Sequence, residues 1–219
     1  MTIKIACAVL SLLVVIVATK SQDQRLFGQR ASSEWANHVN IKLRLTEKRV
    51  DRWVFEMTAS NIGSSSVFIM TDAVRDDSSK GAYVIAEHES PAWLEISSRL
   101  FPPSPYCTLT GTVHVTLQRL DPGASYTTDV EVPLPPKETT PPYRNPLDAR
   151  TIDSSNIRYV KASIGVLPDE EGIRDFLKHK EGIGPYASGR EDIKKGAFSG
   201  KSLFELQSIA SSQPVAVTF

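Results

Sequence analysis

Cysteines are scarce in this chain, and neither sign of charge is in excess. Among 219 residues there are two cysteines, Cys7 and Cys107. If Cys7 is removed with a leader peptide, Cys107 has no partner within the chain, which excludes an internal disulfide. We then expect Cys107 either to be buried and inert or to pair with another chain. The 25 basic and 25 acidic residues leave no net charge, so the composition argues against nucleic acid as a partner.

A hydrophobic run long enough to cross a membrane is also missing. The N-terminal apolar run extends from Ile5 to Ala18, whereas a transmembrane helix needs about 20 residues. Lys4 precedes this run and the small residues Thr19 and Ser21 follow it, which is the pattern of a secretory signal peptide. We therefore predict a cleavable signal peptide at residues 1–21 and a secreted or periplasmic protein. The alternative is an uncleaved N-terminal anchor, the one case in which a membrane is a partner.

Sequence motifs for catalysis or metal binding are absent. There is no H-x-x-x-H or H-E-x-x-H pair for zinc and no G-x-S-x-G elbow. The stretch GAFSGKS at 196–202 ends like a phosphate-binding loop, but Gly196 is one residue too close to Gly200 and no buried strand precedes it. We therefore predict no catalytic residue, metal, cofactor or nucleotide. Because a triad of distant residues leaves no local motif, a secreted hydrolase remains an alternative.

Alternating apolar and polar residues dominate the first two thirds of the chain. In 38–46, Val39, Ile41 and Leu43 alternate with polar residues, and 52–60 repeats the pattern after a polar turn, so the two runs predict a β-hairpin. Six further strand candidates lie at 67–70, 81–87, 92–101, 112–120, 125–132 and 156–167. Such runs, separated by Gly, Pro, Ser and Asp clusters, predict a mainly β protein with an antiparallel β-sandwich over residues 34–167.

The sequence LDPGASY carries a family resemblance. Its pattern L-x-P-G-x-x-Y resembles the turn that enters strand F of fibronectin type III and related immunoglobulin-like sandwiches, and residues 55–70 resemble a strand, glycine turn and strand of the same architecture. The resemblance implies an immunoglobulin-like β-sandwich. The resemblance also implies that Leu120 is a core residue and that Pro122 and Gly123 form the turn. It implies that Tyr126 forms a tyrosine corner, in which its hydroxyl caps upstream backbone groups.

The composition changes from residue 168 onward. Acidic residues begin this segment, and Ile173, Phe176 and Leu177 follow at helical spacing, which predicts a short amphipathic helix. Ser202 and Glu205 have the spacing of a capping box, which favours a helix over a strand for 202–210. The terminal residues PVAVTF alternate and predict a last strand. We expect residues 168–219 to be an appendage packed on the sandwich.

The expected function is that of an exported, non-catalytic binding or structural module of the cell envelope or extracellular space. Its partner would be a protein or a glycan, and the alternatives are the hydrolase and a proteinase inhibitor that presents one rigid loop. Loops at one end of a sandwich commonly carry binding residues. The candidate interaction residues are Asn61, Gly63, Ser64, Ser65, Asp72, Asp76 and Asp77.

Overall fold

A computed structural model describes most of the chain after residue 33. The described residues are 34–74, 80–81, 83–86, 93–100, 114–137, 151–178, 186–188, 193–194, 196–197 and 199–217. The predicted signal peptide and Cys107 lie outside these ranges. Within them, no helix is both long and apolar enough to cross a membrane.

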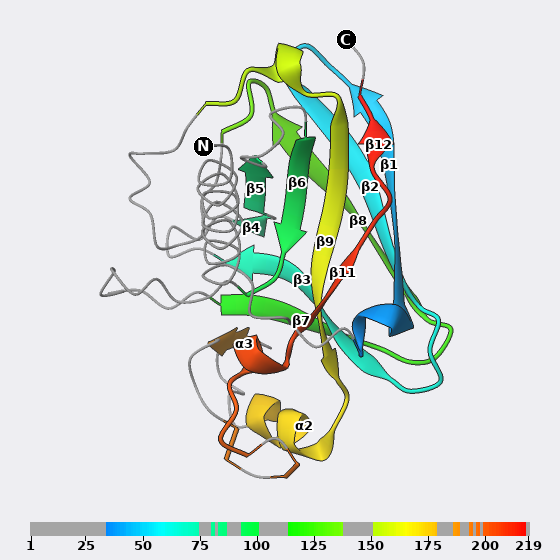
Figure 1. Ribbon diagram of the computed structural model, residues 1–219, viewed down its shortest axis with the longest axis vertical. Helices are drawn as coiled ribbons and strands as arrows, with labels where there is room; N and C mark the ends of the chain where they lie inside the picture. Colours follow the sequence, from blue (N-terminus) through cyan, green and yellow to red (C-terminus); the bar gives the residue numbers. More distant parts are fainter. Residues whose placement is uncertain are drawn as a thin grey trace, which may run out of the picture. The chain divides into compact units, whose positions relative to one another are not determined.

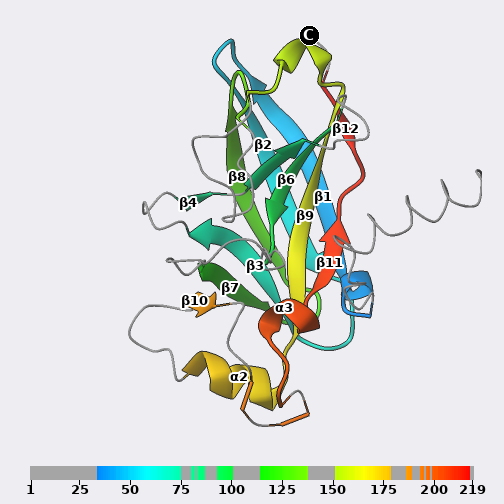
Figure 2. The ribbon, with the colours of Figure 1, turned by 60° about the vertical axis from the view of Figure 1, so that its left-hand side comes forward.

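The described residues form a mainly β structure (Figures 1 and 2). Its strands are β1 (Val39–Lys48), β2 (Arg52–Asn61), β3 (Val67–Val74), β4 (Lys80–Gly81), β5 (Tyr83–Ala86), β6 (Trp93–Ser98), β7 (His114–Leu120), β8 (Ser125–Pro133), β9 (Tyr159–Pro168), β10 (Tyr186–Ser188), β11 (Ser208–Ser211) and β12 (Val215–Ala216). Its helical segments are the short 3-10 turns η1 (Ala36–His38) and η3 (Ser154–Asn156) and the helices α2 (Glu171–Lys178) and α3 (Leu203–Leu206).

The smaller sheet has the strand order β1-β2-β8, and all its pairs are antiparallel. The predicted β1–β2 hairpin is confirmed, with Leu43 opposite Met57. The alternating residues of β1 and β2 divide as the sequence predicts, because the apolar row is buried, apart from the half-buried Leu45, and the other row is exposed or half-buried. This sheet therefore turns one face to the core and one to solvent.

The larger sheet has the order β10-β7-β3-β9-β6-β5, to which β4 is added at β3 and β11 and β12 at β9. β9 lies at its centre and pairs with β3, β6, β11 and β12. The pair β6–β9 is parallel, so the prediction of a purely antiparallel sandwich was wrong at this point. Alternation along a strand predicts which face is buried, but it does not indicate the direction of the neighbouring strand.

The two sheets are joined by a bent ribbon of two strands (Figure 1). β2 continues into β3 and β7 into β8, and the pairing runs from Ser60 opposite Ser125 in one sheet to Val67 opposite Leu120 in the other. The bend lies between these rungs, at residues 61–66 and 121–124. We call this bend the corner, and such corners allow strands to pass from one sheet to another.

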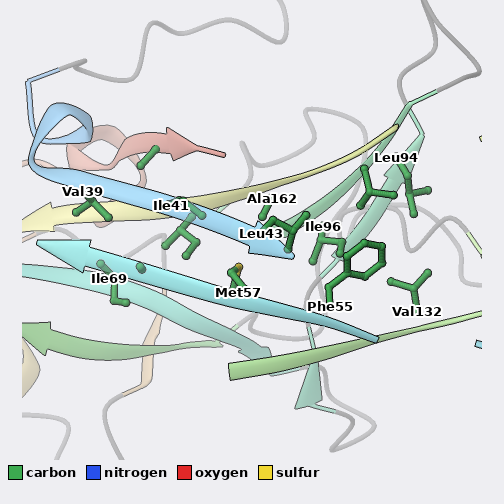
Figure 3. Packing of buried hydrophobic residues seen from close by; sticks show 14 of the residues in the cluster. Val39, Ile41, Leu43, Phe55, Met57, Ile69, Leu94, Ile96, Val132 and Ala162 are labelled. Carbon is green, nitrogen blue, oxygen red and sulfur yellow. The ribbon is translucent and has the colours of Figure 1, made fainter. Parts of the chain in front are cut away.

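Apolar side chains from both sheets fill the space between them (Figure 3). Trp53 and Phe55 of β2 are fully buried there, their rings in edge-to-face contact 6.4 Å apart, and Ile69 and Ala162 lie on the opposite sheet. The large aromatic surfaces removed from water make this cluster the main stabilising feature of the sandwich.

A second apolar cluster lies on the other face of the larger sheet. Phe68, Met70 and Leu167 of β3 and β9 contact residues of the C-terminal segment, among them Ile173 of α2 and Leu203 of α3. Around β3 and the end of β9, the larger sheet is therefore covered on both faces. The described residues, which all follow Ser32, belong to one compact unit that includes this segment.

The segment 202–211 is helical only in its first half. Ser202 and Glu205 form the predicted capping box: the Ser202 backbone N–H donates to Glu205 Oε2 at 2.8 Å, and the Glu205 N–H donates to Ser202 Oγ at 3.4 Å. The helix ends after one turn at Leu206, and Ser208–Ser211 form β11. The helix prediction for 202–210 was therefore wrong over its second half, where the edge of β9 supplies backbone partners that a local pattern does not reveal.

Candidate functional site

The predicted interaction residues of 61–65 lie in the corner. Asn61 is 1% exposed, so it is a structural residue and not a contact residue. Its side-chain N–H groups donate to the carbonyls of Ser65 at 2.9 Å and Leu120 at 3.0 Å, and its Oδ1 accepts from the Gly63 N–H at 3.0 Å. Ser64 and Ser65 are exposed. Of the predicted aspartates, Asp72 lies in β3, while Asp76 and Asp77 lie outside the described residues.

Backbone bonds complete this corner. The Asn61 N–H donates to the Ala124 carbonyl, and the Gly123 N–H donates to the Asn61 carbonyl, both at 2.9 Å. Pro122 and Gly123 occupy the middle of a turn closed by the Ala124 N–H and the Asp121 carbonyl, and Gly123 has a φ of 78°. A positive φ of this kind favours glycine. Asn61 therefore connects both strands of the bend through its backbone and its side chain.

The other two residues of the L-x-P-G-x-x-Y pattern face the core. Leu120 is 3% exposed, in agreement with the predicted core position. Tyr126 is half-buried, with its ring against the core cluster. Among the described residues its hydroxyl has no hydrogen-bond partner, so the predicted backbone cap is not part of this geometry.

An ion-pair cluster joins the larger sheet to the start of α2. The Asp169 side chain is 3% exposed and accepts from Arg119 Nε at 2.7 Å and Arg174 Nη1 at 3.2 Å. Hydrogen bonding to Asp169 raises the pKa of Arg119 above its ordinary value. Because charge-assisted hydrogen bonds are strong, these two ion pairs tie β7 to the start of α2.

The GAFSGKS segment does not have the geometry of a phosphate loop. Residues 193–194 before it are not in a strand, and the helix after it, α3, has only four residues. Gly200 has a φ of 81°, and its N–H donates to the Ile193 carbonyl at 2.8 Å. The Ser202 hydroxyl is engaged in the capping box. These features agree with the prediction of a glycine connector before a helix cap.

The described residues with the greatest chemical variety lie on the outer face of the parallel pair β6–β9. Three pairs of side chains are directly in register there: Trp93 with Tyr159, Glu95 with Lys161 and Ser97 with Ser163. They face away from the core because the alternate residues of both strands, such as Leu94 and Val160, lie in it. We call these three rungs, together with Arg99, the polar ladder.

The part of the polar ladder that follows the Trp93–Tyr159 pair forms a closed hydrogen-bond ring. Ser163 Oγ donates to Glu95 Oε1 at 2.5 Å, and the hydroxyls of Ser97 and Ser163 lie 3.0 Å apart. Because the Ser163 proton points to Glu95, Ser97 must donate to Ser163, and Ser97 Oγ then accepts from Arg99 Nε at 3.1 Å. Each serine hydroxyl of the ring thus donates one hydrogen bond and accepts one.

Opposite charges are paired within the ladder. Glu95, whose side chain is 12% exposed, lies 3.6 Å from Arg99 Nη2 and 3.7 Å from Lys161 Nζ. Burial lowers the pKa of Arg99, and the neighbouring Glu95 charge opposes this effect. Both cations have further interactions beside these.

The rung formed by Trp93 and Tyr159 is aromatic and open to solvent. The rings of Trp93 and Tyr159 lie 5.1 Å apart, tilted by 35°. Tyr159 is 41% exposed, Trp93 is half-buried, and Lys161 Nζ lies 6.0 Å from the Trp93 ring. Neither the indole N–H nor the phenol O–H has a hydrogen-bond partner among the described residues. We call these two rings the aromatic platform.

The groups of the ladder differ in their access to solvent. Ser163 is hydrogen-bonded to a carboxylate but is only 2% exposed, so a substrate has no direct access to it. Within the described part of the chain no group of three His, Cys, Asp or Glu side chains is placed to hold a metal ion. The exposed chemistry of the ladder is therefore that of its two rings.

Sequence analysis missed this site although it predicted both strands. The signal was present as charged and aromatic residues at the outward positions of 92–101 and 156–167. The pairing of two runs more than 60 residues apart has no local signature. A scan of family models, a search of curated proteins and a search of solved structures each found no match to the chain.

Proposed function

We propose that this protein is an exported, non-catalytic binding module of the cell envelope or extracellular space. It engages a protein or glycan ligand through the aromatic platform. An immunoglobulin-like sandwich, for which the turn from Leu120 to Tyr126 is the support, is part of the same proposal. Export follows from the signal pattern of residues 1–21.

The aromatic platform is the observation that carries the proposal. Large aromatic side chains bury much surface on contact and lose little side-chain entropy, which suits them to recognition. The closed ring of Glu95, Ser97 and Ser163 below them holds the two strands in register. A rigid support of this kind reduces the entropic cost of binding.

The hydrolase alternative finds less support in these contacts. A general base must reach the proton that it removes, yet Glu95 is already held by Ser163, Arg99 and Lys161. The inhibitor alternative needs a rigid, protruding loop, and 61–65 is the one predicted loop that the structure describes. Its Asn61 is bound into the corner, so this loop supports the sandwich.

Affinity capture tests the proposed function. The mature protein is immobilised and exposed to native envelope extract or culture fluid, in parallel with the double variant Trp93→Ala/Tyr159→Ala. Loss of the platform should reduce recovery of the captured ligand by about fivefold or more, since aromatic contacts contribute about 0.5–1.5 kcal/mol each. Ile62→Ala is the control, because Ile62 is 66% exposed and lies at the corner. Equal capture by all three proteins would contradict the proposal.

A further inference from the structure

The ladder narrows the chemistry of the ligand, provided that the proposed binding function holds. Its single carboxylate, Glu95, is paired with both Arg99 and Lys161, and both cations have further partners. A charged ligand would have to displace one of these contacts. A ligand without net charge meets no such competition, because it leaves the ion pairs in place.

The backbone at the platform also limits the kind of ligand. Leu94, next to Trp93, pairs with β9 on one side and β5 on the other. Tyr159 pairs with β6 and with β12. An extended peptide binds readily by adding a strand to an open edge, whereas at Leu94 and Tyr159 both edges are already paired. Recognition at this place therefore depends on side chains.

We propose that the platform binds a neutral polysaccharide, with the rings of Trp93 and Tyr159 against the C–H face of a hexopyranose unit. One face of such a sugar presents C–H groups that pack on an aromatic ring, and its rim carries hydroxyls. The indole N–H and the phenol O–H, which have no partner among the described residues, are available to those hydroxyls. A neutral sugar can contact the rings and leave the ion pairs of Glu95 with Arg99 and Lys161 in place.

Isothermal titration calorimetry against soluble polysaccharides tests this inference. The neutral probes are an α-glucan, a β-glucan, a mannan and a galactan, and the acidic comparators are polygalacturonate and chondroitin sulfate. We expect at least one neutral probe to bind with an affinity that 0.5 M NaCl changes less than twofold, since screening weakens contacts between exposed charges. Binding of acidic probes alone, or of none, would overturn the inference.

Variants locate the binding on the platform. Tyr159→Ala should weaken the affinity about 3- to 10-fold, in keeping with the contribution of one aromatic contact, whereas Tyr159→Phe should weaken it less. Trp93→Phe should still bind, but the change in tryptophan fluorescence on binding should vanish with it. Trp35 and Trp53 remain in that variant as internal references. Unchanged affinity in folded Tyr159→Ala would place the sugar elsewhere and contradict the inference.

The two proposals fail in different ways. If Trp93→Ala/Tyr159→Ala loses a captured protein while no neutral polysaccharide binds, the binding function stands and the sugar inference falls. If the double variant captures everything that the parent captures, the platform is not a binding surface, and both proposals fall.

Discussion

Asn61 shows how one polar residue determines a change of direction in the chain. Its side chain is buried and bonded to the backbone of Gly63, Ser65 and Leu120. A buried carbonyl that loses its hydrogen-bond donor still carries the free-energy cost of its removal from water. An asparagine in this place is thus worth more to the fold than an exposed loop residue.

Asn61→Ala should lower the free energy of unfolding by about 2–4 kcal/mol, because it removes three hydrogen bonds at a buried position. Urea unfolding followed by circular dichroism measures this. The comparison is Tyr126→Phe, which should change stability by less than about 0.5 kcal/mol since its hydroxyl has no described partner. If Tyr126→Phe lowers the free energy of unfolding more than Asn61→Ala does, the prediction is wrong. The bend is then stabilised by the tyrosine corner that the resemblance implies.

Individual elements of this fold depend on contacts that a short helix or strand does not make by itself. α3 has a single turn, and a helix of that length does not form alone in water. The capping box and the burial of Leu203 and Leu206 stabilise this turn, which intrinsic helix propensity alone would not. Hydrogen bonds from the backbone and hydroxyl of Ser202 lower the pKa of Glu205 below its ordinary value of 4.5.

The capping box should make stability depend on acid. Because the pKa of Glu205 is lower in the folded state, its stabilising contribution is fully present well above pH 4.5 and is lost as the pH falls through the folded-state value. The stability difference between the parent and Glu205→Gln, from urea unfolding at pH 7 and pH 3, should therefore shrink at pH 3. An equal difference at both pH values would show that the carboxylate charge has no role.

A matched pair of serines tests the cap itself. Ser202→Ala should cost about 0.5–1 kcal/mol at pH 7, the usual effect of an N-cap replacement. Ser199→Ala in the same connector removes an exposed hydroxyl that donates to Lys194, and it should be nearly neutral. Similar losses in both variants would assign the effect to the connector and not to the cap.

Sequence patterns predicted the faces of the elements better than their partners. The apolar row Trp53, Phe55 and Met57 is buried as expected because alternation places every second residue on one face. The parallel pairing of β6 with β9, and hence the ladder, was not predictable since a strand's own sequence carries no record of its neighbour. For the same reason 208–211 became a strand beside β9 despite its helical spacing.

At the scale of the whole molecule, export is the property that can be tested most directly. If Ile5–Ala18 is the core of a cleaved signal peptide, the protein recovered from cells begins between Thr19 and Gln24. N-terminal sequencing or intact mass of the secreted or osmotically released protein measures this. Recovery of a chain that still begins with Met1 in a membrane fraction would support the anchor instead.

The central place of β9 has a consequence for how the protein is made. β9 begins at Tyr159, late in the chain, yet it is the strand that joins β6 to β3. While the earlier part of the chain emerges during synthesis or translocation, β6 has β5 as its described partner and an open second edge. The larger sheet therefore cannot join β6 to β3 before β9, which ends at Pro168, has emerged. Until then the edge of β6 that pairs with β9 is open, and an unpaired strand edge of this kind promotes aggregation.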